Sequence, residues 1–396
     1  MKKKILFMVS SMNVGGVEKS LLSLFADIPK NKYDITLMLL EKKGGFIDNI
    51  PGWVKVEVAP WFNDVQPIIM QPPQQTVRGY LTKKRFIKLM YFIYAYFISK
   101  YFNNRHYYYR SVLKNVPNNL TKYDIAISYQ GPTDIIDYYI AYKVTASKKI
   151  SWVHFDVNKH QINKKLYKRL YRNYTNIFAV SQQAKEILIE KIPSISKKTE
   201  VFFNIIPKDL IIEMSKIPME FDDGFKGLKI TTVGRLAKEK GQDLAIKVLS
   251  RLRSEGYNVR WYCIGEGNER KEYELLIQDY GLKSDFFLLG AKLNPYPYIL
   301  QSDIYVQTSR HEGYCLTLAE AKCLNKPIVT TNFTGAYEQI MDGYNGFIVN
   351  CHEEDLYIKI KKLIVNKSER DRLGGNLLND SINTIDENQK VYHYFE

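Results

Sequence analysis

Two glutamates, Glu312 and Glu320, flank a short turn in the segment SRHEGYCLTLAE, residues 309–320. If residues 316–324 form a helix, Glu320 lies on its first or second turn and Glu312 lies in the preceding loop. Free backbone donors and the helix dipole favour an anion at the N-terminus of such a helix. The donors would be the N–H groups of Gly313, Tyr314, Cys315 and Leu316. Two carboxylates beside a bound anion suit a nucleotide diphosphate sugar, which carries hydroxyls on both sides of its pyrophosphate.

This spacing alone is a weak signal, because 42 of the 396 residues are acidic. A second fragment, VGRLAKEKGQDLAI, places Arg235 and Lys240 between an expected strand and an expected helix. A planar guanidinium and a compact ammonium both suit pyrophosphate oxygens. For this fragment alone, a solvated turn with two ordinary cations is an equally good interpretation.

Apolar runs and amphipathic stretches alternate along the chain, which is typical of parallel sheets with crossover helices. In the first half, strands are predicted at 5–9, 35–40, 54–58, 124–128, 149–153 and 177–180, and a helix at 17–25. The second half has predicted strands at 229–233, 259–264, 286–289, 304–307 and 327–330, and helices at 242–255, 269–280, 318–324 and 353–364. The fold class is therefore α/β, with two Rossmann-like doubly wound domains. Because such sheets bind ligands at the carboxyl ends of their strands, we expect one cleft between the facing domains.

The length of the chain favours two domains. We assign residues 1–210 to an N-terminal domain with an insert at 65–123, and residues 211–380 to a C-terminal domain. The join is expected near 207–225, and residues 381–396 are expected to pack back on the N-terminal domain. The apolar run at 5–9 is too short for a signal peptide and indicates a buried strand. The sequence shows no uncharged apolar segment long enough to span a bilayer.

Composition narrows the class of protein. Hydrophobic content of 45% with 25% charged residues indicates an ordinary globular chain. The four cysteines form no CxxC pair, which favours free thiols in a reducing compartment. Residues 1–215 contain 33 Lys/Arg and 16 Asp/Glu, whereas the remainder contains 24 and 26. We therefore expect the N-terminal half to meet an anionic partner.

Four motifs together resemble a known family. In chain order they are SSMNVGGVEKSL, GRLAKEKG, HEGYCLTLAEA and KPIVTTNFTGAYEQIMDGYNGFIV, the last with an acid at Glu338. This combination resembles the retaining GT-B glycosyltransferases of glycosyltransferase family 4, also called glycosyl transferases group 1. The resemblance is strongest over residues 229–349 and absent between 60 and 121. The chain departs from the family pattern at Cys315 and Thr317, where Gly or Pro, and Pro, are frequent, so sugar selectivity does not follow from this loop.

The resemblance implies roles for individual residues of the C-terminal half. Arg235 and Lys240 would hold the donor diphosphate, in place of the divalent metal that other sugar-transferring folds use. Glu320 would accept hydrogen bonds from the ribose hydroxyls, and Glu312 would contact hydroxyls of the transferred sugar. The N–H groups of residues 313–316 would bind phosphate and sugar oxygens. Neither a metal nor a cofactor is expected beyond the nucleotide-sugar co-substrate.

The N-terminal half is expected to contribute three residues to the same site. Gly15 and Gly16 would let the first loop approach the pyrophosphate, because a Cβ would collide there and glycine permits positive φ. The alternative for this pair is a plain strand-to-helix turn. His154, in KISWVHFDV, resembles the family's histidine near the transferred sugar, although a lone histidine is more often structural. Asp156, two residues further on, is expected to face the acceptor. A surface acid or a helix cap is an equally good interpretation of Asp156.

The implied reaction is a metal-independent transfer with retention of anomeric configuration. The donor is expected to be a uridine diphosphate sugar, with guanosine diphosphate mannose as the second choice. The acceptor is expected to be a hydroxyl of a lipid-linked, surface or capsular polysaccharide.

Glu312 could serve as a covalent nucleophile. We favour a front-face route, in which the leaving diphosphate helps to deprotonate the acceptor and Glu312 orients the donor. Alternatives are a GT-B epimerase or phosphorylase, and a basic nucleic-acid- or membrane-binding protein with a vestigial site.

The insert is basic and aromatic. Residues 65–123 contain ten Lys/Arg and no acid, interleaved with many Phe and Tyr. A helix of this composition within 83–110 is expected to lie on an anionic membrane, which would make the protein cytoplasmic and peripheral on the inner face of the cell membrane. The alternatives are a core helix with a solvated basic edge and a nucleic-acid-binding surface. No nucleic-acid partner is expected, because no RNA- or DNA-binding signature accompanies the segment.

Overall fold

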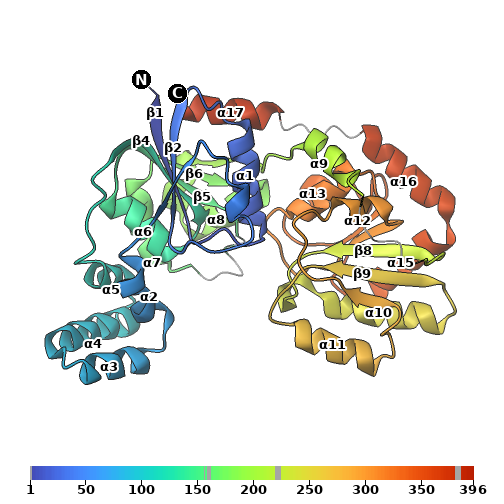
Figure 1. Ribbon diagram of the computed structural model, residues 1–396, viewed down its shortest axis with the longest axis horizontal. Coiled ribbons are helices and arrows are strands. Elements are labelled where there is room, and N and C mark those ends of the chain that lie inside the picture. Colours follow the sequence, from blue (N-terminus) through green and yellow to red (C-terminus); the bar gives the residue numbers. More distant parts are fainter. Residues whose placement is uncertain (1, 156, 158–161, 219–223, 380–384) are drawn as a thin grey trace.

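Two parallel sheets, each covered by helices, form two domains that face one another (Figure 1). The structure is a computed structural model, and it describes residues 2–155, 157, 162–218, 224–379 and 385–396. The chain has the α/β class and the two doubly wound sheets that the sequence predicts.

The N-terminal sheet has the strand order β3-β2-β1-β4-β5-β6-β7 with every pair parallel. Its strands are β1 (Lys3–Val9), β2 (Tyr33–Leu39), β3 (Lys55–Val58), β4 (Lys122–Gly131), β5 (Thr145–Val153), β6 (Asn176–Ala179) and β7 (Thr199–Val201). The helices are α1 (Gly16–Asp27), α2 (Phe62–Met70), α3 (Pro73–Thr82), α4 (Phe86–Tyr101), α5 (Arg105–Val112), α6 (Asp134–Lys143), α7 (Lys164–Leu170) and α8 (Gln182–Lys191). Short 3-10 turns cover Ile47–Asn49, Tyr171–Asn173 and Pro193–Lys198. The interior strand β1 contains the apolar run 5–9 that is too short for a signal peptide, and these residues are fully buried.

The C-terminal sheet has the order β10-β9-β8-β11-β12-β13, again all parallel. Its strands are β8 (Leu228–Val233), β9 (Val259–Ile264), β10 (Phe286–Leu288), β11 (Ile304–Gln307), β12 (Ile328–Thr331) and β13 (Phe347–Val349). The helices are α9 (Lys208–Ser215), α10 (Gln242–Ser254), α11 (Arg270–Asp279), α12 (Tyr296–Gln301), α13 (Leu316–Cys323), α14 (Ala336–Gln339), α15 (Glu353–Val365) and α16 (Lys367–Asn379), with a 3-10 turn at Lys238–Lys240. Helix α9 spans the expected boundary at 210/211 and packs on α12 and α13, so it belongs to the C-terminal domain.

Strand order determines where each sheet binds a ligand. In the N-terminal sheet, strands β1 to β3 are added towards one edge and strands β4 to β7 towards the other, so the order switches between β1 and β4. In the C-terminal sheet the order switches in the same way between β8 and β11. A crevice opens at the carboxyl ends of the strands at such a switch point. The residues singled out in the sequence follow β1, β5, β8 and β11, so they all lie on the carboxyl edges of the two sheets.

The expected insert at 65–123 is a helical lobe formed by α2 to α5, which lies between β3 and β4 (Figure 1). Its predicted end at residue 123 is wrong, because Lys122 and Tyr123 already belong to β4 and pair with β5. Tyr123 is buried in the core of the N-terminal domain.

The last helix, α17 (Ile385–Phe395), lies on the N-terminal domain although it follows the C-terminal one (Figure 1). Val391 and Phe395 are buried in the N-terminal core, where Phe395 meets Phe7 edge to face with ring centroids 6.2 Å apart. The Tyr392 hydroxyl donates to the carbonyl oxygen of Asp27 over 3.0 Å. The chain therefore crosses between the domains a second time before it ends.

Among the residues that the structure describes, none of the helices is both long and apolar enough to span a bilayer. All four cysteines are free thiols.

Candidate active site

Helices α1 and α13 meet across the domain interface at their N-terminal ends. A Cβ added to Gly16, the first residue of α1, would lie 3.7 Å from Cδ1 of Leu316, the first residue of α13. Each helix end carries a partial positive charge and unsatisfied N–H groups. An anion held between two such ends is stabilised by both domains at once. The expected use of positive φ is wrong for this loop, because Gly15 is extended at φ −145° and Gly16 is not in the left-handed region.

The start of α13 offers free backbone donors. Within the described part of the chain, the N–H groups of Gly313, Tyr314, Cys315 and Leu316 donate no hydrogen bond. Cys315 is the N-cap, and it adopts φ +68°, a left-handed conformation that is uncommon for a residue with a Cβ. Glycine is frequent at this position in the family that the sequence resembles.

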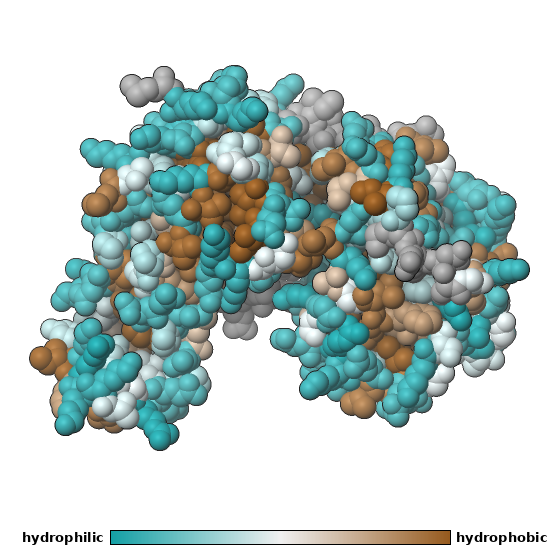
Figure 2. All heavy atoms as spheres, viewed as in Figure 1, coloured by the Kyte–Doolittle hydropathy of each residue, from teal (hydrophilic) through white to brown (hydrophobic). Residues whose placement is uncertain are grey.

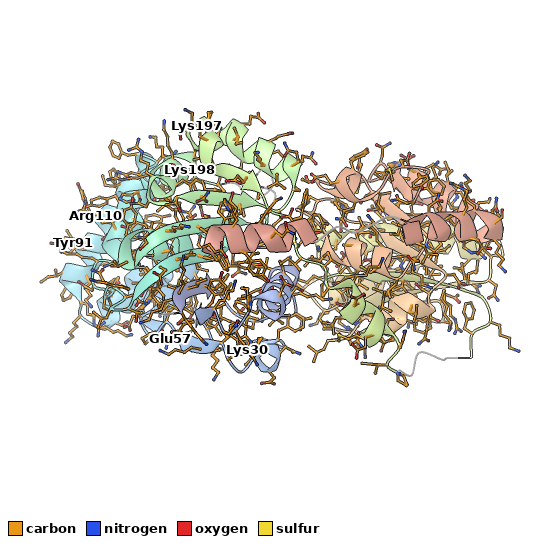
Figure 3. The ribbon with its side chains drawn as sticks, turned by 90° about the horizontal axis from the view of Figure 1, so that it is seen from above. Lys30, Glu57, Tyr91, Arg110, Lys197 and Lys198 are labelled. Atoms are coloured by element: carbon orange, nitrogen blue, oxygen red, sulfur yellow. The ribbon has the colours of Figure 1, made fainter. Side chains whose placement is uncertain are left out.

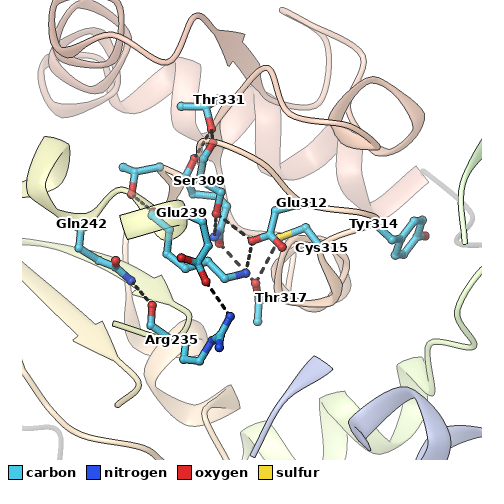
Figure 4. A network of polar contacts seen from close by, with 12 residues as sticks. Arg235, Glu239, Gln242, Ser309, Glu312, Tyr314, Cys315, Thr317 and Thr331 are labelled. Carbon is cyan, nitrogen blue, oxygen red and sulfur yellow. Dashed lines mark hydrogen bonds and ion pairs between the residues drawn. The ribbon is translucent and has the colours of Figure 1, made fainter. Parts of the chain in front are cut away.

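Glu312 and Lys240, which are 72 residues apart in sequence, form an ion pair at the carboxyl ends of β8 and β11 (Figure 4). The same carboxylate oxygen accepts a hydrogen bond from the Ser309 hydroxyl over 2.8 Å. Ser309 in turn accepts from the Gln307 amide over 2.8 Å. Burial lowers the pKa of the Lys240 ammonium, but Glu312 and Cys315 together raise it by more, so the pKa lies above its ordinary value. Lys240 is thus charged, and the ion pair is in place before any ligand arrives.

Arg235 lies at the mouth of the same cluster. Its guanidinium pairs with Glu239 over 2.6 Å, and 65% of the Arg235 side chain is exposed. The following turn requires Gly241, which has φ +70° and whose added Cβ would lie 2.2 Å from the carbonyl oxygen of Thr308. This close approach brings the Arg235–Lys240 turn against the loop that carries Glu312. An exposed cation in a weak surface pair is free to exchange its partner for a phosphate.

Glu320 is almost fully buried, and its partner comes from the other domain. Lys19 of α1 approaches Glu320 Oε1 to 2.6 Å, with side-chain exposures of 22% and 3%. The Lys19 ammonium also lies 4.5 Å from the centre of the Tyr296 ring. The other oxygen, Oε2, has no hydrogen-bond partner among the described residues. A buried carboxylate oxygen without a donor is ready to accept one from a ligand hydroxyl.

Glu18 is a second acid that the sequence analysis did not select. It lies in the first turn of α1 with 6% exposure, and its Oε2 would be 2.5 Å from a Cβ added to Gly15. Burial raises the pKa of Glu18 to about 7, opposed by a backbone hydrogen bond and by the positive charge of Arg235. Glu18 and Lys19 both belong to the motif SSMNVGGVEKSL. Their place directly after the paired glycines was the available signal for them.

His154 follows β5 and reaches the same interface. Its imidazole is buried beside Tyr129, with ring centroids 4.7 Å apart, and its Nε2 has no hydrogen-bond partner among the described residues. Burial lowers the pKa of His154 to about 3, so the ring is neutral. A Cβ on Gly313 would lie 2.4 Å from the carbonyl oxygen of His154, so only glycine fits where the two loops touch. Asp156 lies outside the described residues.

Glu338 joins the domains at another point. Its two carboxylate oxygens accept hydrogen bonds from the backbone N–H groups of Gln182 and Gln183 over 3.0 and 3.1 Å. These donors belong to the first turn of α8 in the N-terminal domain, where a carboxylate is favoured by the helix dipole. This contact holds the two domains in register beside the cleft.

The structure thus brings every described candidate residue to one interface: Gly15, Gly16, His154, Arg235, Lys240, Glu312, Gly313, Tyr314, Cys315, Leu316 and Glu320. Gly313 and Gly16 make the contacts between domains, and Tyr314 faces Phe203 with ring centroids 6.0 Å apart. Among the described residues, no group of three or more His, Cys, Asp or Glu side chains has a metal-binding arrangement.

Comparison with known proteins identifies the domain that holds most of this site. Residues 221–378 match the model of the family "Glycosyl transferases group 1". Over these residues the chain is similar to glycosyl transferases group 1, and we call the matched stretch the group 1 domain. Arg235, Lys240, Glu312 and Glu320 all lie within the matched residues, as the sequence resemblance predicts.

Curated relatives are similar to part of the chain. The chain is 31% identical to the capsular polysaccharide biosynthesis glycosyltransferase CapM of Staphylococcus aureus over 36% of this chain and 38% of the relative. It is 29% identical to the N-acetylgalactosamine-N,N'-diacetylbacillosaminyl-diphospho-undecaprenol 4-alpha-N-acetylgalactosaminyltransferase of Campylobacter jejuni, over 49% of this chain and 52% of the relative. The matches therefore span about half or less of each relative.

Solved structures extend the likeness to the whole chain. Anabaena Alr3699/HepE, in complex with UDP and glucose, matches 99% of both chains with a TM-score of 0.72 and 20% identity. A mutant form of S. aureus TarM matches all of both chains with a TM-score of 0.69 and 13% identity. The fold of the group 1 domain together with its N-terminal partner is GT-B.

Proposed function

We propose that this protein is a retaining, metal-independent glycosyltransferase that transfers a sugar from a nucleotide diphosphate sugar to an acceptor hydroxyl. The observation that carries the proposal is the meeting of the α1 and α13 N-termini beside Arg235 and Lys240. Two helix ends and two cations around one point provide the charge that a diphosphate requires. They would also stabilise the charge that develops on the leaving diphosphate.

The ion pairs of the free protein support a donor site in which partners are exchanged. A diphosphate would take Arg235 from Glu239 and would share Lys240 with Glu312. The ribose hydroxyls would donate to Glu320, replacing the Lys19 ammonium that now holds it. Lys19 would then be free to face the diphosphate. Neutral His154 would hydrogen-bond the transferred sugar without adding charge.

In the proposed mechanism Glu312 orients the donor and does not attack it. Its carboxylate is held by Lys240 and Ser309, and a carboxylate whose charge is neutralised by an ion pair is a poor nucleophile. The leaving diphosphate would instead accept the proton of the acceptor hydroxyl on the same face of the sugar. The acceptor then enters from the side that the leaving group vacates, so the anomeric configuration is kept.

For the donor we propose a uridine diphosphate sugar, with guanosine diphosphate mannose as the second choice. Similar HepE structures hold UDP, UDP with glucose, or UDP-glucose. For the acceptor we propose a lipid-linked, surface or capsular polysaccharide. The names of the relatives support this, because they include a capsular polysaccharide enzyme, a diphospho-undecaprenol enzyme and a poly(glycerol-phosphate) alpha-glucosyltransferase.

Donor hydrolysis tests this proposal without knowledge of the acceptor. The protein is mixed with UDP-glucose, UDP-N-acetylglucosamine, UDP-galactose or GDP-mannose, and products are followed by proton NMR. We expect slow hydrolysis of one donor, insensitive to EDTA, with the anomer of the donor released first. Arg235→Ala should slow it about 100-fold, because the charge on the leaving group loses a positioned cation.

A matched control is Arg251→Ala, which removes an arginine that also pairs with a glutamate four residues on in the same domain. Its hydrolysis rate should stay within about twofold of the unmodified protein. An epimerase would instead change the sugar of the intact donor, and a phosphorylase would require phosphate. Release of the opposite anomer, or equal rates in both arginine variants, would refute the proposal.

A further inference from the structure

Helix α4 carries an apolar stripe that nothing in the described part of the structure covers. Leu89, Phe92 and Ala95 are buried on the face that packs towards α3 and α5. The opposite face exposes large apolar side chains, among them Phe86, Ile87, Met90, Tyr91, Tyr94, Phe97 and Tyr101. Positions 86, 90, 94, 97 and 101 lie on one line along a helix. Exposure reaches 77% at Ile87 and 67% at Met90, so the stripe faces outward over four turns of helix.

The stripe is bordered by cations from two separate parts of the sequence. Residues 65–123 contain ten Lys/Arg and no acid, and residues 157–185 also contain no acid. The second segment includes α7, KKLYKRL, in which Lys164, Lys165, Lys168 and Arg169 are exposed. The fold brings these segments together, because α5 packs against both α4 and α7. Lys165 donates to the carbonyl oxygen of Phe102, just after α4, over 3.5 Å.

Cations from both segments act on one residue of α5, His106. Burial, together with the charges of Arg169 of α7 and Arg110 of α5, lowers the pKa of His106 to about 4. Among the described residues, Arg105 is the one cation of α4, α5 and α7 that forms an ion pair with an acid, namely Asp134. We call the exposed faces of α4, α5 and α7 the basic apolar surface. It lies at the outer end of the N-terminal domain, the end at which Figure 3 labels Tyr91 and Arg110.

We propose that the basic apolar surface docks the protein on an anionic lipid bilayer. The α4 stripe enters the boundary between headgroups and acyl chains, and the surrounding lysines and arginines meet anionic headgroups. Helix α4 is hydrophobic on both faces, which is typical of a helix that is covered on both. A membrane covers the outer face without a partner protein.

Charge excludes a second copy of the chain as the occupant. A two-fold interface would place the same surface on both sides, so its unpaired cations would oppose one another. Side-chain type disfavours nucleic acid, because bases stack on aromatic rings whereas Ile87 and Met90 are aliphatic and among the most exposed residues of the stripe. An anionic bilayer provides both an apolar phase and negative charge.

Docking would present the cleft to membrane-bound substrates. Helix α7 begins in the connection that follows His154, so the basic apolar surface extends from α4 towards the candidate active site. Figure 1 shows α3 and α4 projecting away from the two sheets, and Figure 2 shows a hollow between this lobe and the C-terminal domain. An acceptor anchored in the bilayer at the base of the lobe could reach the cleft. This last step alone rests on the proposed transferase function.

Vesicle flotation of the full chain tests docking, with phosphatidylcholine vesicles and with vesicles that also contain phosphatidylglycerol. We expect binding to the anionic vesicles at least about tenfold stronger than to the neutral ones, weakening as salt is raised. The stripe variant Ile87→Glu/Met90→Glu should lose flotation. The cation variant Lys164→Gln/Lys168→Gln should bind the anionic vesicles about tenfold more weakly, with a shallower salt dependence.

Two control variants match these changes in the C-terminal domain, where the exposed residues lie far from α4. Leu275→Glu/Ile358→Glu adds the same charge at exposed apolar positions, and Lys271→Gln/Lys283→Gln removes the same number of exposed lysines. Both should float like the unmodified chain. Donor hydrolysis in solution should be unchanged in the docking variants. A failure of the docking proposal can therefore be distinguished from a failure of the transferase proposal.

Four results would overturn the docking proposal. They are equal flotation with both kinds of vesicle, no flotation with either, equal loss in the stripe variant and its control, and a dimer in light scattering that Ile87→Glu/Met90→Glu dissociates. A single-stranded oligonucleotide that binds the unmodified chain and not the cation variant, in the absence of flotation, would assign the surface to nucleic acid instead.

Discussion

At the scale of single residues, most acids of the cleft have a cation beside them. Glu239 pairs with Arg235, Glu312 with Lys240 and Glu320 with Lys19. In the free protein, these ion pairs therefore neutralise the charged side chains that a ligand would contact. Glu18 is different, because burial dominates its environment and raises its pKa to about 7.

Glu18 therefore predicts a dependence of stability on pH. Its pKa is higher in the folded chain than its ordinary value of 4.5, so the folded state binds this proton more tightly. The contribution is fully present below about pH 4.5 and is lost as pH rises through about 7. Relative to Glu18→Gln, the unmodified chain should lose about 3 kcal/mol of unfolding free energy across that window.

Chemical denaturation at a series of pH values measures this difference. The matched control is Glu190→Gln, at an exposed glutamate on α8, which should follow the unmodified chain at every pH. Parallel curves for the unmodified chain and Glu18→Gln would show that Glu18 titrates normally.

Residue types and spacing singled out the donor-site candidates of the C-terminal half, and the resemblance to glycosyltransferase family 4 implied their roles. Arg235, Lys240, Glu312 and Glu320 follow strands of one sheet and belong to local motifs. Their partners were harder to predict. Lys19 meets Glu320 only because two domains face one another, and one sequence does not reveal how α1 of one domain is placed against α13 of the other.

At the scale of elements, the N-terminus of α13 holds a residue with a Cβ in a left-handed backbone conformation, which such residues rarely adopt. Cys315 is buried and sits at φ +68° as the N-cap. The surrounding loop is held by the Gln339 amide, which donates to the carbonyl oxygen of Tyr314. The fold therefore determines the conformation of this position, and the side chain tolerates it.

This strain predicts an unusual order of stability. Cys315→Gly should be more stable than Cys315→Ala by about 1 kcal/mol, although it removes one more atom, because glycine adopts positive φ without strain. Cys323, at the last position of the same helix, is the matched control. There alanine should be more stable than glycine by about 1 kcal/mol. Thermal and chemical denaturation of the four variants measure both differences, and the same order at both positions would contradict the account.

The long alternating elements could be predicted from periodicity, and most strand boundaries agree within one or two residues, as for β9 at Val259–Ile264. The insert could not be divided into its helices. Helix α4 is apolar on both faces, so it lacks the one-sided period by which a helix is recognised. Only the structure separates the buried face of α4 from its exposed stripe.

At the scale of the whole molecule, the residues of the proposed function are divided between the domains. The C-terminal domain supplies Arg235, Lys240, Glu312 and Glu320, and the N-terminal domain supplies α1, His154 and the basic apolar surface. Helix α17 returns to the N-terminal core, and Glu338 caps α8 across the interface. These contacts hold together two halves of one site, neither of which surrounds a diphosphate alone.

The assignment of Glu320 as the ribose ligand is tested most directly by calorimetric titration of UDP, 2′-deoxy-UDP and GDP. The unmodified chain should bind UDP about tenfold more tightly than 2′-deoxy-UDP, because the missing hydroxyl leaves the buried Glu320 oxygen without a donor. In Glu320→Ala the two ligands should bind equally. Failure of the unmodified chain to bind either UDP or GDP would contradict the central claim, as would a preference for UDP that persists in Glu320→Ala.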